Sequence, residues 1–305
     1  MKYLITGGAG FLGIKLAEML LKDKKNKVFI LDNFSKKKSN KGFLKILKNK
    51  NIKVIKKDLN YISDYLKIYD FDFIFHFAAI LGVQKVINNP FITLENNVQT
   101  TISLINFARK QKKLKKICFT STSEVYAYTL KKKLAEYPTP ENIDFLLSKD
   151  FDPRSSYLLS KIVGEYLMNY SNLNFIIFRP HNIFGPDMGF AHVIPQLTKK
   201  FLKDKKGKIV INNAKHKRTF CNIDFAIDLI LNISHNKKLT KKIFNIGSPE
   251  KEVSIMMLAK KIKKILGSNK VLTSSNLHKD NSPEKRRPKM NRSLRYARLK
   301  HNFEK

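Results

Sequence analysis

Acidic residues and cysteine are scarce in this sequence, and long apolar runs are absent. Among 305 residues there are 24 Asp and Glu against 60 Lys and Arg, and 2 cysteines. Cys118 and Cys221 stand in apolar surroundings without metal-ligand spacing, so we expect buried free thiols and no metal site. No apolar run reaches the length of a membrane span, and the first predicted strand begins at Lys2, which leaves no room for a signal peptide. These features predict a soluble cytoplasmic protein without a membrane partner.

The formal net charge of +36 raises the question of a nucleic-acid partner. The excess is mostly lysine, is spread over every predicted surface and accompanies a surplus of Asn and Ile, whereas residues that read bases or clamp phosphates are more often arginine. We therefore attribute most of the charge to a bias towards A and T in the coding sequence, and we do not expect nucleic-acid binding. The charge should still attract anionic substrates.

A glycine-rich turn separates the first predicted strand from the first predicted helix. Gly7, Gly10 and Gly13 are spaced by three residues in T-G-G-A-G-F-L-G, after the apolar run 3–5. Such glycines permit a tight turn, close approach of the backbone to a pyrophosphate, and close packing of helix on strand, with the phosphates at the helix N-terminus. An ordinary strand-to-helix turn is the alternative to a dinucleotide site.

The second predicted strand, residues 27–31, ends at Asp32 and Asn33. An acidic side chain at this place can accept both hydrogen bonds of the adenosine ribose diol and repels a 2′-phosphate, which favours NAD over NADP. Lysines at residues 36–38 weaken this inference. An Asp that opens a turn before Asn and Ser is the alternative.

Strands and helices alternate regularly up to residue 178, which predicts an α/β fold with a doubly wound parallel sheet and a ligand at the carboxyl ends of its strands. His76 lies inside an apolar strand, so we interpret it as a packed core histidine and not as a base. A short helix is expected near residues 141–147, and a loop over 274–289. We expect a Rossmann-type NAD-binding domain at residues 1–178, to which 220–247 return, and a smaller C-terminal substrate lobe formed by 179–219 and 248–305.

Groups that can move protons follow the predicted strand at residues 116–120. Thr122 and Glu124 stand at its carboxyl end, and Tyr157 and Lys161, four residues apart, share one face of a later helix. A phenol near an ammonium and a nicotinamide cation would have its pKa lowered towards neutrality, which makes it a usable general base. A polar strand end and a Tyr/Lys pair are each common alone, but together with the glycine turn they favour a catalytic site.

With these residues in place, the chain resembles the extended short-chain dehydrogenase/reductases that act on nucleotide sugars, the NAD-dependent epimerase/dehydratase family. Each motif is weak alone, and their order and spacing carry the resemblance. The motifs are T-G-G-A-G-F-L-G (6–13), L-D-N-F-S (31–35), T-S-T-S-E-V-Y (120–126), Y-L-L-S-K (157–161), R-P-H-N-I-F-G-P (179–186), R-T-F-C-N-I-D (218–224) and N-I-G (245–247).

The resemblance implies roles for individual residues. Tyr157 would be the base that removes the sugar 4-hydroxyl proton, Lys161 would hold the nicotinamide ribose and lower the pKa of Tyr157, and Thr122 would hydrogen-bond the same hydroxyl. The residues implied to bind NAD are Gly7, Gly10, Phe11, Leu12, Asp32, Asn33, Asp58, Leu59, Ala78, Ala79, Tyr157 and Lys161. The residues implied to grip a nucleotide-diphosphate sugar are Asn182, Arg218 and one of Arg286 or Arg287.

The implied reaction begins with oxidation at C4 of the sugar, which gives a 4-keto sugar and later returns the hydride. An epimerase turns the ketone, a dehydratase removes the C5 proton and the 6-hydroxyl, and a decarboxylase uses the ketone as an electron sink. The Thr-Ser-Glu ending in Glu124 resembles 4,6-dehydratases and UDP-glucuronate decarboxylases, which favours these over a UDP-glucose 4-epimerase-like reaction. The alternative of another class is a redox-inactive NAD-binding or RNA-binding module, against which the pair Tyr157 and Lys161 argues.

Three departures from the family's pattern, and one further implication, concern the site and the assembly. Ala127 stands where the family usually has Gly, and Lys289 stands where an Asp often follows R-x-P, which leaves the choice between Arg286 and Arg287 open. The family's final helix is expected to be missing after a segment at 299–303. The resemblance also implies a homodimer through the helices that include Tyr157.

Overall fold

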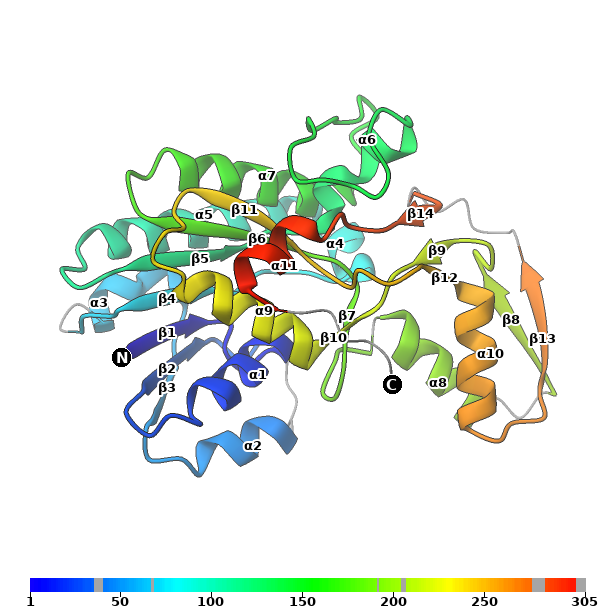
Figure 1. Ribbon diagram of the computed structural model, residues 1–305, viewed down its shortest axis with the longest axis horizontal. Helices are drawn as coiled ribbons and strands as arrows, with labels where there is room; N and C mark the ends of the chain where they lie inside the picture. Colours follow the sequence, from blue (N-terminus) through cyan, green and yellow to red (C-terminus); the bar gives the residue numbers. More distant parts are fainter. Residues whose placement is uncertain (36–40, 67–68, 191, 204–206, 276–282, 300–305) are drawn as a thin grey trace.

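The computed structural model describes residues 1–35, 41–66, 69–190, 192–203, 207–275 and 283–299. Its centre is a seven-stranded sheet in the order β11-β6-β5-β4-β1-β2-β3, with every neighbouring pair parallel (Figure 1). The strands are β1 (Lys2–Thr6), β2 (Lys27–Asp32), β3 (Ile52–Lys56), β4 (Phe73–His76), β5 (Lys116–Thr120), β6 (Phe175–Pro180) and β11 (Lys242–Ile246). The strand order reverses beside β1, so a ligand crevice is expected between the carboxyl ends of β1 and β4.

Helices cover both faces of this sheet (Figure 1). Successive strand residues point to opposite faces, and accordingly Tyr3 and Ile5 enter one core while Leu4 enters the other. One face carries α1 (Phe11–Leu20), α2 (Lys41–Leu47), α9 (Ile223–His235) and α11 (Asn291–Ala297), and the other carries α3 (Ile62–Leu66), α5 (Pro90–Arg109) and α7 (Ser155–Asn169). The predicted doubly wound α/β fold is confirmed.

A smaller lobe stands beside the carboxyl edge of the sheet, at the right of Figure 1. It consists of α8 (Val193–Lys203), β8 (Lys208–Asn212), α10 (Ile255–Ile265) and β13 (Val271–Ser275), with β8 and β13 paired in parallel. Leu197, Phe201, Leu258 and Ile262 belong to its separate apolar core. Five short strands join the lobe to the sheet, namely β7 (Ile183–Phe184), β9 (Lys217–Arg218), β10 (Cys221–Asn222), β12 (Val253–Ser254) and β14 (Lys285–Arg286).

The chain returns to the central layer twice after entering the small lobe. Helix α9 and strand β11 come from the segment 220–247, which was expected to return. Helix α11 comes from the segment 248–305 but packs on the central layer, where Met290 and Ala297 enter the core and Ser293 Oγ donates to Asn245 O at 2.5 Å. Residues 300–305 lie outside the described residues.

The helix expected near residues 141–147 is wrong, because these residues form an irregular excursion and the helix of this connection is α6 (Ala127–Lys131). Glu141 is held by distant partners: its carbonyl oxygen accepts from Arg179 Nη1 at 2.9 Å, and its Oε1 accepts from Asn245 N at 2.9 Å. Tertiary hydrogen bonds therefore outweigh local helix propensity here. The loop expected over 274–289 is partly wrong as well, since β13 extends to Ser275 and β14 lies within it; residues 276–282 lie outside the described ones.

The cysteines behave as predicted, since Cys118 and Cys221 are buried free thiols. His76 is buried and its pKa is lowered to about 3 by desolvation and then by the charge of Lys161, which agrees with a packed neutral histidine. Within the described parts of the chain, no helix has the length and apolar character needed to cross a bilayer.

Candidate active site

The glycine-rich turn packs directly against the end of β4. Gly7 has a φ of 67°, and a Cβ there would lie 2.6 Å from Ala78 N. A Cβ at Gly13 would lie 2.6 Å from Gly8 Cα, and Gly10 N donates to Gly7 O at 3.0 Å just before α1 begins. Bare backbone therefore lines the crevice at the N-terminus of α1, and this cradle fits a pyrophosphate.

Asp32 ties this turn to the end of β2. Its Oδ2 accepts from Ala9 N at 3.1 Å, and its Oδ1 accepts from Phe34 N at 2.8 Å. Asp58, after β3, accepts from Asn60 N at 2.8 Å and thereby caps a short 3₁₀ helix, η1 (Leu59–Tyr61). The other predicted NAD residues lie close to these elements: Phe11 and Leu12 begin α1, Asn33 follows β2, Leu59 opens η1, and Ala78 and Ala79 follow β4.

Tyr157 and Lys161 lie in the first two turns of α7, and Lys161 extends to the carboxyl end of β5. Lys161 Nζ donates to Thr120 O at 2.8 Å and lies 5.9 Å from the centre of the Tyr157 ring. Thr122 follows β5 and shares a side-chain hydrogen bond with Tyr157. The fold thus brings together three groups that are separated by 35 and 4 residues in the sequence.

The protein groups do not lower the pKa of Tyr157 as the sequence predicts. Burial, followed by the negative charge of Glu124, raises this pKa, and the hydrogen bond from Thr122 opposes the rise. Burial also lowers the pKa of Lys161 to about 7, against the charge of Glu165, which raises it. If Tyr157 acts as a base, the positive charge that lowers its pKa would have to come from the nicotinamide cation. Lys161 contributes less, because burial lowers its own pKa and so reduces the fraction that carries a charge.

Glu124 lies in a short 3₁₀ helix, η2 (Ser123–Tyr126), and is held by two arginines. Its Oε1 and Oε2 accept from Arg286 Nη1 and Nη2 at 2.5 and 3.1 Å, and Arg154 Nη2 lies 3.5 Å from both oxygens. Burial opposes ionisation, but the charge and hydrogen bonds of Arg286, followed by the charges of Arg154 and Arg218, lower the pKa of Glu124 to about 2. The carboxylate is thus firmly ionised at neutral pH.

The two arginines between which the sequence left a choice point to different partners. Arg286 pairs with Arg218 across β14 and β9, and it contacts Glu124, whereas Arg287 Nη2 donates to Pro249 O at 2.9 Å. Arg218 Nη1 donates to Lys217 O and Glu284 O, and Asn182 Nδ2 donates to Thr219 O at 3.1 Å. Arg286 therefore faces the predicted catalytic groups, and Arg287 does not.

Asn97 was not identified from the sequence, and it connects the segment after β4, in the predicted NAD site, with α7, the helix that carries Tyr157 and Lys161. Its Oδ1 accepts from Ile80 N at 2.7 Å, and its Nδ2 donates to Ile80 O at 3.1 Å and Ser160 Oγ at 3.2 Å. Ser160 Oγ in turn donates to Tyr157 O at 2.7 Å. The available signal was an amide at a buried position of a helix, where a polar side chain needs partners.

No individual role was assigned from the sequence to Arg154, which contacts Glu124, or to Arg179. Arg179 is fully buried, donates to Glu165 Oε1 and Oε2 at 2.9 and 2.6 Å, and also donates to Tyr126 OH at 2.7 Å. These bonds join β6, α7 and η2, so they fix the helix that carries Tyr157 relative to the end of β5. A charged residue inside an otherwise apolar strand was the signal for this buried pair.

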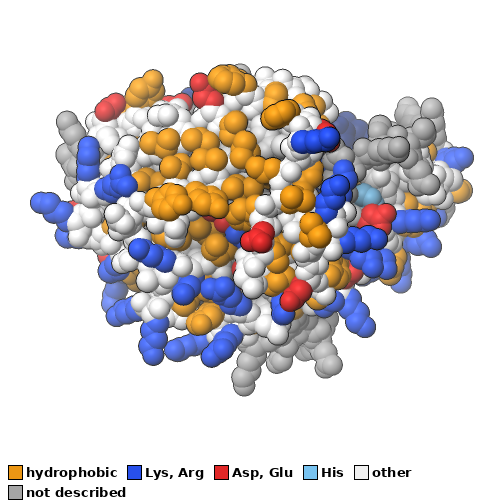
Figure 2. Space-filling model, turned by 90° about the horizontal axis from the view of Figure 1, so that it is seen from above, with side chains coloured by type: hydrophobic (Ala, Val, Ile, Leu, Met, Phe, Trp, Pro, Cys, Tyr) orange, Lys and Arg blue, Asp and Glu red, His pale blue; other side chains and the backbone are white. Residues whose placement is uncertain are grey.

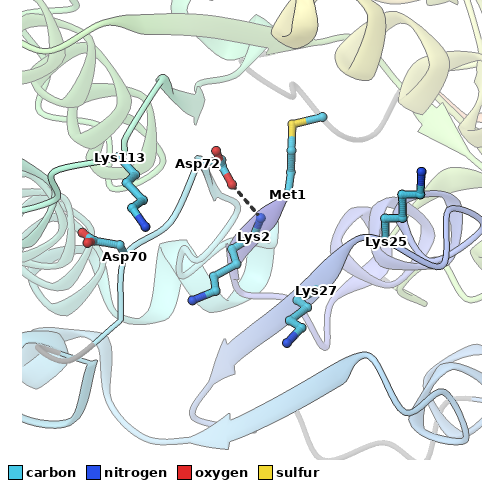
Figure 3. Close-up of a pocket in the computed structure, with 7 residues that line it drawn as sticks. All are labelled: Met1, Lys2, Lys25, Lys27, Asp70, Asp72 and Lys113. Carbon is cyan, nitrogen blue, oxygen red and sulfur yellow. Dashed lines mark hydrogen bonds between the residues drawn. The ribbon is translucent and has the colours of Figure 1, made fainter.

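A separate hollow of about 260 Å³ lies at the amino ends of the strands (Figure 3). Asp72 Oδ2 accepts from Lys2 N at 2.8 Å within it. The residues that line it are Met1, Lys2, Lys25, Lys27, Asp70, Asp72 and Lys113. This hollow lies at the opposite edge of the sheet from Tyr157 and the glycine turn, so it is not the predicted site.

Comparison with known proteins agrees with this geometry. The NAD dependent epimerase/dehydratase family matches residues 3–247, and the chain belongs to this family. It is therefore an NAD-dependent enzyme, and the predictions of family, enzyme class and cofactor are confirmed. The family match includes the glycine turn, Thr122, Tyr157 and Lys161.

Individual relatives are similar over most of this chain. A UDP-N-acetyl-alpha-D-glucosaminuronate decarboxylase of Bacillus cytotoxicus is 34% identical over 87% of this chain and 80% of its own length. The bifunctional polymyxin resistance protein ArnA of Wigglesworthia glossinidia brevipalpis is 33% identical over 88% of this chain, which spans only 42% of that protein. The structure of UDP-glucuronic acid 4-epimerase from Bacillus cereus shares the fold, with a TM-score of 0.81, 23% identity, and coverage of 99% and 94%.

Proposed function

We propose that this enzyme oxidises a nucleotide-linked uronic acid at C4 and then decarboxylates it. The observation that carries the proposal is the clamp of Glu124 by Arg286 and Arg154 beside Tyr157. A second candidate is a 4,6-dehydratase of a neutral nucleotide sugar, which the similarity to a dTDP-D-glucose 4,6-dehydratase of Dictyostelium discoideum favours, at 31% identity over 86% of this chain and 61% of that protein.

The protonation state of Glu124 supports decarboxylation over dehydration. A dehydratase needs a base that removes the C5 proton, and a carboxylate with a pKa of about 2 is a weak proton acceptor. Decarboxylation needs no base at C5. The bond between C5 and the carboxylate carbon breaks, its electron pair enters the adjacent C4 ketone, carbon dioxide leaves, and C5 then takes up a proton.

The arginines around Glu124 favour a substrate that carries a carboxylate in addition to its diphosphate. Arg286 and Arg154 both contact Glu124, and Arg218 lies close enough to lower its pKa, so one carboxylate lies among three guanidinium groups. Forked guanidinium groups match carboxylates and phosphates. We propose that Arg218 and Arg286, with Asn182, grip the diphosphate and the sugar carboxylate, and that Arg287 supports β14 from the other side.

Tyr157 and Thr122 would act on the 4-hydroxyl group. Thr122 hydrogen-bonds Tyr157, so a sugar hydroxyl that replaces one partner of this bond would be oriented for transfer of its proton to the phenol oxygen. Lys161, anchored on Thr120 O, would hold the nicotinamide ribose at the end of β5. NAD, when bound, supplies the acceptor for the C4 hydride. The residues proposed to hold it are Gly7, Gly10, Phe11, Leu12, Asp32, Asn33, Asp58, Leu59, Ala78, Ala79, Tyr157 and Lys161.

Mass spectrometry of the products separates the candidate reactions. The protein with NAD is incubated in parallel with UDP-glucuronate, UDP-N-acetylglucosaminuronate, dTDP-glucose and UDP-glucose. Loss of carbon dioxide from a uronate, with no change in the neutral sugars, is the expected result. Loss of water from dTDP-glucose would replace the proposal with a dehydratase, and an isobaric product of changed retention time would replace it with an epimerase.

We also propose a homodimer that forms through α5 and α7. Figure 2 shows apolar side chains gathered on one broad face, and its assignment to these helices is supported by the exposed residues Phe91 and Ile92 of α5, Tyr166 of α7 and Tyr170, which directly follows α7. Sedimentation of the protein and of Tyr166→Glu tests this, because a dimer should dissociate in the variant. Buried free Cys118 and Cys221 support a reducing location, for which we propose the cytoplasm.

A further inference from the structure

The free end of the small lobe combines protruding apolar side chains with lysines. The C-terminal ends of α8 and α10 meet the first residues of β8 and β13 here, because Lys270 Nζ donates to Phe201 O at 2.7 Å and Val271 N donates to Gly207 O at 2.7 Å. We call this region the lobe tip, and its described residues are Leu202, Lys203, Gly207, Lys208, Lys263, Lys264, Ile265, Leu266, Lys270 and Val271. It belongs to the small lobe and not to the central layer that carries the glycine turn and Tyr157 (Figure 1).

Three apolar side chains at the lobe tip are largely exposed. Ile265 is 82% exposed, Leu202 is 70% exposed and Val271 is 59% exposed. The apolar faces of α8 and α10 are already buried against each other through Phe201 and Ile262, so these three side chains are not needed for the lobe core. Single exposed apolar residues are common, but a group at one end of a small lobe indicates a contact surface.

Among the described residues of the lobe tip, every charged side chain is a lysine; Asp204, Lys205 and Lys206, between Lys203 and Gly207 in the sequence, lie outside the described residues. Helix α8 contains three lysines, β8 one and α10 four, and none of these elements, nor β13, contains Asp or Glu. Lysine amines on flexible stems can reach anionic groups while the neighbouring aliphatic side chains enter an apolar layer. A lipid bilayer with anionic headgroups offers both, because its phosphates lie at the surface and its apolar layer begins directly beneath them.

We propose that the lobe tip docks this enzyme on an anionic phospholipid surface. Leu202, Ile265 and Val271 enter the headgroup region, and the surrounding lysines contact lipid phosphates. Lysine contacts the phosphates of lipids and of nucleic acids alike, but exposed aliphatic side chains favour lipid, because nucleic-acid sites combine their basic groups with base-reading side chains or aromatic stacking. The docking does not depend on which sugar the active site takes.

Vesicle co-sedimentation with paired variants tests the proposal. The whole protein is mixed with vesicles of phosphatidylcholine alone and of phosphatidylcholine with phosphatidylglycerol, and we expect binding to the second kind only. Leu202→Ser/Ile265→Ser should weaken that binding about tenfold or more, because two exposed aliphatic side chains are removed from the membrane contact. The matched control Leu44→Ser/Leu134→Ser removes two leucines that are 53% and 70% exposed elsewhere, and it should bind like the parent.

The remaining outcomes each overturn the proposal. Equal weakening in both double variants, or weakening in neither, would mean that general positive charge binds the vesicles without the tip. No binding to anionic vesicles would also overturn it, as would stronger binding to single-stranded RNA or duplex DNA that the tip substitutions do not change. NAD-dependent turnover in vesicle-free solution should be unchanged in both double variants, which shows that they fold.

Discussion

Both terminal nitrogens of Arg286 donate to the Glu124 carboxylate, at 2.5 and 3.1 Å, across 162 residues of sequence. The pair joins the end of β5 to the short strand β14, and therefore joins the central sheet to the segment that follows the small lobe. Glu124 is thus a structural anchor of the site as well as a candidate for contact with the substrate.

Because of this ion pair, the free energy of unfolding should fall when the pH is lowered into the acid range. The pKa of Glu124 is about 2 in the folded protein against an ordinary 4.5, so its contribution is complete above pH 4.5 and is lost as the pH falls towards 2. The difference between these two pKa values corresponds to about 3 kcal/mol of unfolding free energy at neutral pH. Urea unfolding at pH 6 and pH 3 should show that the parent loses more stability than Glu124→Gln. Equal losses would contradict the strength of the pair, and Glu95→Gln, at an exposed position of α5, serves as the control.

Removal of the Tyr157 hydroxyl should abolish turnover while NAD still binds. Tyr157→Phe keeps the ring beside Lys161 but removes the oxygen proposed to accept the substrate proton, and we expect turnover to fall about 10²–10⁴-fold. Turnover and NAD titration by fluorescence are measured on the same sample. Tyr128→Phe, which removes a nearby hydroxyl that bonds Ser155 Oγ at 2.8 Å, should retain activity. Undiminished turnover in Tyr157→Phe would exclude the phenol as the base.

The affinity for NAD should fall as the pH rises through about 7. Burial lowers the pKa of Lys161 to about 7, so the ammonium form, which makes the stronger hydrogen bonds to the ribose, is lost above that pH. Calorimetric titration with NAD between pH 6 and pH 9 should show a several-fold weakening. In Lys161→Arg the side chain stays charged, and the pH dependence should disappear even if the affinity is lower. An affinity that stays constant in the parent would show that the Lys161 charge does not contribute.

Asn97 should position the catalytic helix and the segment after β4 at the same time. Asn97→Leu leaves Ile80 N and O without their partner, and we expect a loss of about 2–4 kcal/mol in unfolding free energy and a lower kcat with little change in KM. Ser160→Ala keeps both bonds between Asn97 and Ile80 and removes the bonds of Ser160 Oγ with Asn97 and with Tyr157 O, so it should have a smaller effect on stability. If Asn97→Leu lowered stability but left kcat unchanged, Asn97 would be structural only.

Local patterns predicted most of the central sheet. Apolar runs of three to seven residues identified all seven strands, and the strand at residues 116–120 matches β5 at both ends. Glycine spacing identified the turn against Ala78, because a turn with φ near 67° and no room for Cβ imposes its own residue type. The i, i+4 spacing of Tyr157 and Lys161 likewise predicted their shared face, since helix geometry alone determines it.

Where the sequence prediction was wrong or incomplete, distant partners decided the structure. Residues 141–147 have helix-forming composition, but Arg179 and Asn245 hold Glu141 in an irregular segment. The pKa of Tyr157 is raised because burial dominates, and burial is a property of the packed fold and not of spacing. Asn97 could not be distinguished from any other amide of a helix until Ile80 and Ser160 lay beside it.

The sequence by itself therefore determined the family, the parallel sheet, the glycine cradle and the Tyr157 and Lys161 pair, because each depends on residues within one strand, turn or helix. Only the tertiary structure decided that Arg286 rather than Arg287 faces Glu124, and that Glu124 is held ionised. Adjacent residues of a strand point to opposite sides, so that choice depends on the register of β14 against β9, which brings residues far apart in the chain into contact.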